Sequence, residues 1–198
     1  MATTKKPSAS LFRLRIELND IAPLIWRRFW IEGDVSLAQL HHSIQAIMGW
    51  TDSHLHDFQI GGARYSTPTP YDELDDPSID DRKVQMQKVL KGITTFGYQY
   101  DFGDSWQHTI TIEEIAPPPE YPRGCAFVIE GERACPPEDA GGAHQYQEFL
   151  DRLAKNPRHK EVKAFLEWAG EDFKPNLFDR HAANAALLRM AWNQWGKK

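Results

Sequence analysis

Apolar and polar residues alternate along much of the first half of the chain, which is the period of a strand with one buried face. The alternation is clear over residues 11–18 and continues over 24–31, with the turn residues Asn19, Asp20 and Pro23 between them. Two hairpins are predicted further on. One turns at Gly61-Gly62 and the other, over 94–115, turns at Gly103-Asp104.

Helical spacing replaces this alternation in four places. Ser36 stands three residues before Gln39, the pattern of a capping box, and apolar residues then follow at helical spacing up to Gly49. In the last third, the spacing predicts helices over 146–153, 162–169 and 179–191. Strands followed by helices predict a single α+β domain over 11–198, an antiparallel sheet of hairpins with helices packed on it. Residues 1–10 are expected to form a disordered tail.

Two long segments show neither the alternation of a strand nor the spacing of a helix. Residues 66–92 contain six acidic side chains between Asp72 and Asp81 with no basic residue among them, which is typical of a solvated acidic loop. Residues 117–143 are rich in proline and glycine and predict a long ordered loop.

Charge narrows the range of partners. The 23 Lys and Arg residues against 28 Asp and Glu residues give a net charge of −5, which argues against broad non-specific DNA binding. Six of the acidic residues belong to one segment, so the remainder is nearly neutral and leaves room for a local basic patch. The sequence shows neither a long apolar run nor a secretory signal, and we expect a cytoplasmic protein that does not bind membranes.

The two cysteines, Cys125 and Cys135, are ten residues apart, which does not match a zinc motif. Reduced thiols are the expectation for a cytoplasmic protein, although a turn could bring the pair together.

The segment 52–57 contains His54 and His56. In an extended strand these two imidazoles would share a face and could bind one metal ion, with Asp52 or Asp57 orienting a ring. The pattern specifies no third ligand, so a polar strand edge with local hydrogen bonds is the favoured explanation and no metal is assigned from it.

The segment 100–108 contains Tyr100, Asp101, Asp104, Trp106 and His108. If the strand extends back to Asp104, then Asp104, Trp106 and His108 share one face, and the carboxylate could orient the imidazole as a general base. The same face continues through apolar residues, which favours a core histidine.

Two further segments could bind ligands. Gly141-Gly142 precedes a helix, so its backbone amides could bind an anion, although Glu138 and Asp139 would repel one. In Trp26-Arg27-Arg28-Phe29-Trp30, arginines alternate with aromatic residues and could contact phosphates and bases. Alternatively, these arginines pair with the acidic loop.

In this order and spacing, three of these segments resemble the plasmid pRiA4b ORF-3-like family. They are IAPLIWRRFWIEGDVSLAQLHHSIQAIMGWTDSHLHDFQIGGARY, YQYDFGDSWQHTITIEEI and GERACPPEDAGGAHQYQEFL, and the resemblance extends from about Leu11 to Asp179. It implies a compact α+β domain and an occurrence on bacterial plasmids and mobile elements as well as chromosomes. It implies no catalytic residues.

Two functional hypotheses follow. The favoured one is a binding or accessory domain without a cofactor, tied to mobile elements through a protein or nucleic-acid partner, rather than an enzyme. Its ligand-binding candidates are Arg27, Arg28, Tyr100, Trp106, Glu138 and Asp139. The alternative is a metal-dependent hydrolase or nuclease that uses His54, His56, Asp101, Asp104 and His108, with Arg27 or Arg28 holding a phosphate. Convergence of the three motif loops would mark a site.

Overall fold

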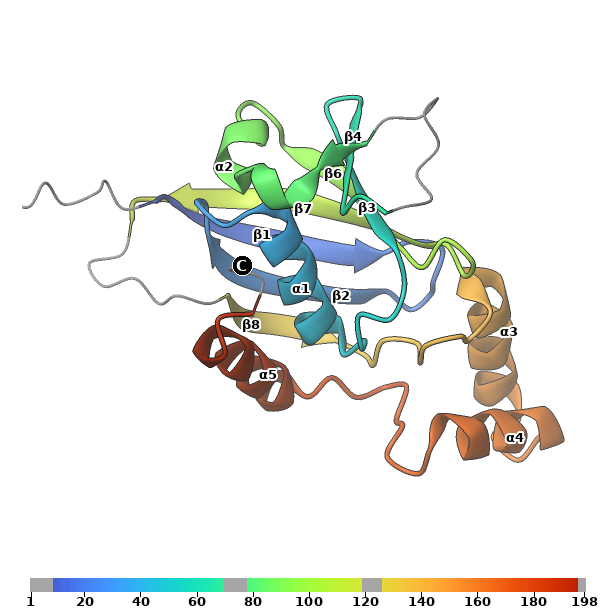
Figure 1. Cartoon of the computed structure of the whole chain (residues 1–198). Coiled ribbons are helices and arrows are strands. Elements are labelled where there is room, and N and C mark those ends of the chain that lie inside the picture. The colour runs from blue at the N-terminus through green and yellow to red at the C-terminus, as the bar shows by residue number, and fades with distance from the viewer. Residues whose placement is uncertain (1–8, 70–77, 119–125, 196–198) are drawn as a thin grey trace, which may run out of the picture.

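One mixed sheet of eight strands organises the molecule, with the strand order β5-β4-β3-β6-β7-β1-β2-β8 (Figure 1). The computed structural model describes residues 9–69, 78–118 and 126–195. All neighbouring strands are antiparallel except β4 and β5, which are parallel. The strands are β1 Leu11–Leu18, β2 Ile25–Glu32, β3 His56–Ile60, β4 Ala63–Ser66, β5 Ile79–Asp80, β6 Thr95–Tyr100, β7 Trp106–Ala116 and β8 Phe127–Glu132.

The central strands follow the alternation in the sequence. Every second residue of β1 is buried, and Leu14 pairs with Phe29 of β2 on one side and Ile112 of β7 on the other. These apolar side chains form the core between the sheet and α1. The predicted α+β class is therefore confirmed.

Helix α1, Leu37–Met48, lies across one face of the sheet (Figure 1). It begins with the predicted capping box, because the Ser36 hydroxyl accepts from the Gln39 amide and the Gln39 side chain accepts from the Ser36 amide. It ends at Gly49, whose φ of 99° is a left-handed conformation that favours glycine.

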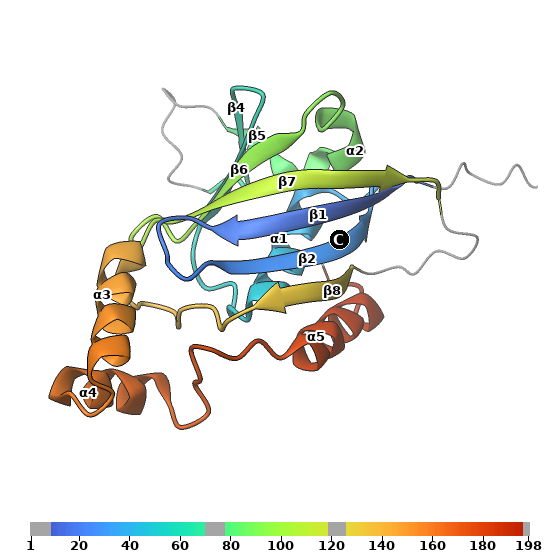
Figure 2. The same cartoon turned by 180° about the vertical axis from the view of Figure 1, so that it is seen from behind.

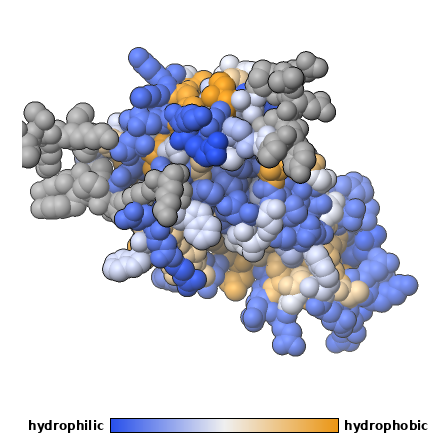
Figure 3. All heavy atoms as spheres, viewed as in Figure 1, coloured by the Kyte–Doolittle hydropathy of each residue, from blue (hydrophilic) through white to orange (hydrophobic). Residues whose placement is uncertain are grey.

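The last third is helical, as predicted. Helices α3, Gly142–Lys155, and α4, Lys160–Ala169, lie at one end of the sheet, whereas α5, Arg180–Trp192, packs beside β8 and α1. No described helix covers the opposite face of the sheet (Figure 2). No helix in the described ranges is long and apolar enough to cross a membrane. The face that carries α1 is largely hydrophilic, with hydrophobic atoms in separate patches (Figure 3).

The acidic segment differs from the expected solvated loop. Besides β5, it contains the 3-10 helix η1, Asp81–Lys83, and the short helix α2, Met86–Val89. Asp81 is fully buried, and hydrogen bonds from His56 and Thr67 satisfy its carboxylate. Four of the six acidic residues lie within residues 70–77, outside the described ranges.

The proline- and glycine-rich segment also contains structure that its composition does not predict. Strand β8 pairs with β2, and Asn184 of α5 hydrogen bonds to both the amide and the carbonyl of Val128. This strand is held by residues far away in the sequence, so the local composition does not predict it. Cys135 is buried, whereas Cys125 lies outside the described residues.

Candidate metal centre and the adjoining histidine network

Three loops that carry the sequence motifs meet at the end of the sheet next to α3 (Figures 1 and 2). They are the segment after α1, the β6–β7 turn and the segment before α3. His54 lies at their meeting point. Its Nε2 is 3.5 Å from Asp139 Oδ1, 3.7 Å from Asp101 Oδ2 and 3.8 Å from Glu138 Oε2.

The backbone of the β6–β7 turn fixes the Asp101 carboxylate. Asp101 has a φ of 54°, and its Oδ1 accepts from the amides of Gly103 at 2.9 Å and Asp104 at 3.3 Å. This is the local bonding that lets aspartate adopt a left-handed turn conformation. Since Oδ1 is occupied, Oδ2 is the oxygen that faces His54.

The two carboxylate oxygens of Glu138 also differ in their surroundings. Its Oε1 accepts from the Tyr100 hydroxyl at 3.0 Å and the Thr51 amide at 2.8 Å. Burial, reinforced by the Glu138 carboxylate, raises the pKa of Tyr100 above its ordinary value, so the phenol stays protonated and donates. Oε2 is buried and has no hydrogen-bond partner among the described residues.

The separations around His54 suit a shared cation better than hydrogen bonds. Distances of 3.5–3.8 Å are longer than a normal hydrogen bond. Two ligands of one tetrahedral ion lie about 3.4 Å apart. One ligand atom each from His54, Asp101 and Asp139 falls within 4.8 Å of the others. Glu138 is outside that mutual set and adjoins it through Oε2.

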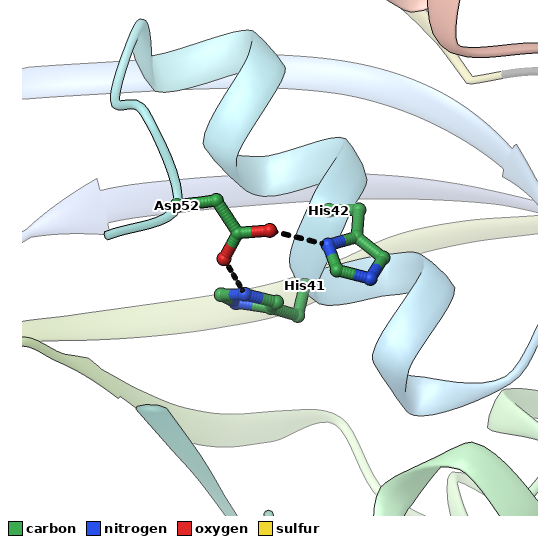
Figure 4. Close-up of side chains that lie close together, drawn as sticks. All are labelled: His41, His42 and Asp52. Carbon is green, nitrogen blue, oxygen red and sulfur yellow. Dashed lines mark hydrogen bonds and ion pairs between the residues drawn. The ribbon is translucent and has the colours of Figure 1, made fainter. Parts of the chain in front are cut away.

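A second cluster lies on α1 and the loop that follows it (Figure 4). Asp52, with a φ of 61°, accepts from His41 Nε2 at 2.5 Å and from His42 Nδ1 at 2.7 Å. On its other side, His41 Nδ1 accepts from the Tyr98 hydroxyl at 2.8 Å, and that hydroxyl accepts from the Gln45 side-chain amide.

Burial decides the protonation state of this cluster. It lowers the pKa of His41 to about 4, although the hydrogen bond to Asp52 acts in the opposite direction. Burial also opposes ionisation of Asp52, but hydrogen bonds from His41 and His42 outweigh it and lower the pKa of the carboxyl. The cluster is therefore a carboxylate that accepts from a neutral His41. Because Asp52 and both nitrogens of His41 are already bonded, a metal ion would have to displace these hydrogen bonds.

Comparison with known proteins places the chain in a family. The model of the plasmid pRiA4b ORF-3-like protein family matches residues 10–182. The chain belongs to this family. The resemblance seen in the sequence motifs is thereby confirmed.

Two relatives cover nearly the whole chain. The uncharacterized protein y4hQ of Sinorhizobium fredii (strain NBRC 101917 / NGR234) is 36% identical over 96% of both proteins. The crystal structure of a protein of unknown function, MM3350 from Methanosarcina mazei Go1, is 32% identical and has a TM-score of 0.76. The match covers 87% of this chain and 96% of that one. Neither name states an activity.

His54 and His56 do not share a site, contrary to one sequence hypothesis. Strand β3 begins only at His56 and His54 belongs to the loop before it, so strand alternation does not apply to His54. His56 instead donates to Asp81 at 2.8 Å and stacks on His41, with 3.4 Å between ring centroids.

Asp104 and His108 also lie apart. Ser105 has a φ of 54° and β7 begins at Trp106, so alternation does not extend back to Asp104. Asp104 accepts instead from the Gly141 amide at 2.9 Å, which gives that amide a protein carboxylate in place of an external anion. Trp106 and His108 are both buried in the core.

Arg27 and Arg28 point to opposite faces of β2, and neither reaches the His54 cluster. Arg27 is buried and donates to the carbonyls of Trp26 and Glu132, both at 2.8 Å. Burial lowers its pKa to about 10, so it stays charged. Arg28 pairs with Glu113 of β7 and Glu130 of β8, and four of the acidic loop's residues lie outside the described ranges. These contacts leave neither arginine placed to hold a phosphate at the cluster.

Sequence reasoning did not identify His41, His42 or Asp81 as candidates. Two adjacent histidines on a predicted helix were the available signal. Their shared partner, Asp52, lies in the loop after Gly49, where a left-handed φ and a hydrogen bond from its amide to the Gln45 side chain position it.

Proposed function

We propose that this protein is a metal-dependent hydrolase whose divalent cation is bound by His54, Asp101 and Asp139. The supporting observation is that three loops direct an imidazole and two carboxylate oxygens to one point without hydrogen bonds between them. An imidazole with carboxylates suits zinc, manganese or iron.

Accessibility favours a catalytic role over a structural one. Asp101 is 8% exposed and anchors one side of the cluster, whereas Asp139 is 74% exposed on the other. A site with three protein ligands and an open side can hold a water molecule, whose pKa the cation would lower. The unpartnered Oε2 of Glu138 is the nearby group that would accept the proton of that water.

The proposal does not extend to a nuclease. Phosphodiester substrates are commonly bound by arginine or lysine, and Arg27 and Arg28 are bonded elsewhere. We therefore expect esters or amides, rather than nucleic acids, to be the substrates.

The test compares two neighbouring aspartates of one turn. Asp101→Asn keeps the Oδ1 acceptor for Gly103 and Asp104 and replaces the oxygen that faces His54. Asp104→Asn removes the same charge from the same turn but from a residue bonded to Gly141. Calorimetric titration with Zn²⁺ and Mn²⁺, and hydrolysis of p-nitrophenyl acetate with each metal, should show binding and turnover in the wild type and in Asp104→Asn.

Asp101→Asn should lose at least about tenfold in metal affinity. Equal affinity in the two variants would contradict the ligand assignment. Metal binding without metal-dependent hydrolysis of p-nitrophenyl acetate would support the metal ligands but contradict the proposed hydrolase activity.

A protein-binding accessory role is the second candidate. On α5, Leu188 is 62% and Trp192 88% exposed, which is unusual for a monomer surface and favours a protein partner. Cross-linking in cells that express the chain, compared with Trp192→Ser, tests this role: a partner lost only in the variant supports it, and an unchanged pattern contradicts it. Association with mobile elements stays a prediction.

A further inference from the structure

A pocket of about 220 Å³ lies between α1 and α5, separate from the His54 cluster. Its walls come from α1, from the segment 50–52 that follows it, and from the second half of α5 with the residues after it. Ala46 and Ala186 are the small side chains that leave this space between the two helices. The volume is below the range of about 300–1,000 Å³ for drug-sized ligands, so it fits a single ring with one substituent.

Aromatic and thioether side chains supply the apolar part of the pocket. Trp50, Met190 and Trp195 line it. The indole N–H of Trp50 is bonded to the Pro136 carbonyl at 3.0 Å, so this ring is fixed and presents only its apolar surface. Trp195 is 58% exposed, and a ligand at the mouth of the pocket would cover it. Such surfaces favour a planar aromatic ring.

Arg189 and His42 are the basic side chains that line the pocket. Arg189 on α5 is exposed, and no described carboxylate forms an ion pair with it. On the opposite wall, Asp52 holds His42 through Nδ1, which turns Nε2 away from the carboxylate (Figure 4). Both oxygens of Asp52 accept from histidines, so the one acidic side chain of the pocket is already bonded. The unpaired charge at the pocket is positive.

We propose that this pocket binds a single-ring aromatic anion, with the ring between Trp50 and Trp195 and the anionic group on Arg189. The site does not depend on the metal centre, because none of the cation ligands lines it.

The test uses a charged probe and a neutral probe of similar shape, phenyl phosphate and benzyl alcohol. Binding is followed by tryptophan fluorescence and calorimetry in the presence of EDTA, so that failure of the metal proposal does not affect the result. The wild type should bind phenyl phosphate more tightly than benzyl alcohol. Arg189→Met should weaken phenyl phosphate about tenfold or more and leave benzyl alcohol unchanged.

Two further variants keep the test decisive. Arg158→Met removes another exposed arginine, on the α3–α4 connection, and should bind as the wild type does. Ala186→Leu fills the pocket and should remove binding of both probes. The proposal is overturned if phenyl phosphate shows no saturable binding at millimolar concentration, or binds no better than the alcohol. Equal effects of Arg189→Met and Arg158→Met would also overturn it.

Discussion

His108 couples the stability of the core to pH. Its side chain is buried between Trp50 and Tyr98, at ring centroid distances of 5.4 and 5.3 Å, and its Nε2 has no hydrogen-bond partner in the described structure. Burial lowers its pKa from 6.5 to about 4. The unfolded chain therefore binds a proton more readily than the folded chain between these two values.

The sign and size of the effect follow from this difference. The stabilisation is complete above pH 6.5 and is lost as the pH falls toward 4, because protons then favour the unfolded chain. With these two pKa values, the loss between pH 7.5 and pH 5 is about 2 kcal/mol for this one residue. His41, whose pKa burial also lowers to about 4, adds a similar loss.

His108→Phe isolates the contribution of His108, because it keeps an aromatic ring in the core and removes the titrating nitrogens. Urea unfolding at pH 7.5 and pH 5, followed by fluorescence and circular dichroism, should show the wild type losing about 2 kcal/mol more than the variant. The His41 contribution cancels, since both proteins retain it. His144→Gln, at an exposed position of α3, should lose as much as the wild type. Equal losses in the wild type and His108→Phe would refute the reasoning.

Three smaller predictions concern the stability of the fold, and each is a change in the free energy of unfolding, measured in urea at pH 7.5. Arg27→Met should cost about 2–4 kcal/mol, because the carbonyls of Trp26 and Glu132 lose the donor that the buried guanidinium supplies. Arg28→Met should cost about 1 kcal/mol or less, and a reversed order would be inconsistent with the burial of Arg27. Ser36→Ala should cost about 1 kcal/mol by removing the cap of α1, and no loss would mean that the cap is redundant. Gly142→Ala should cost at least about 1 kcal/mol, since φ is +78° and the new Cβ would lie 2.5 Å from the Asp104 carbonyl; a stable variant would show that this contact relaxes.

Local signals made most of the fold predictable. The alternation in β1 and the capping box of α1 each involve residues close in sequence, so the same short segment that shows the pattern also forms the structure. Strand β8 forms through hydrogen bonds to β2 and to Asn184, and no local pattern records such distant partners.

The sequence predicted which residues could form the site, but not which of them lie together. His54, Asp101, Glu138 and Asp139 were all candidates, and their convergence depends on three loops closing over one end of the sheet. Both false pairings extended strand alternation beyond the end of a strand. His54 precedes β3, which begins at His56, and Asp104 is separated from β7 by Ser105, whose positive φ a serine does not signal in the sequence as a glycine would.

The location of a bound cation tests the central claim most directly. Crystals grown with Zn²⁺ or Mn²⁺ can be measured at the absorption edge of the metal, so that an anomalous difference map locates the ion. The account predicts a peak about 2.0–2.2 Å from His54 Nε2 and from carboxylate oxygens of Asp101 and Asp139. A map with no peak there, or with its peak at His41, His42 and Asp52, would contradict it.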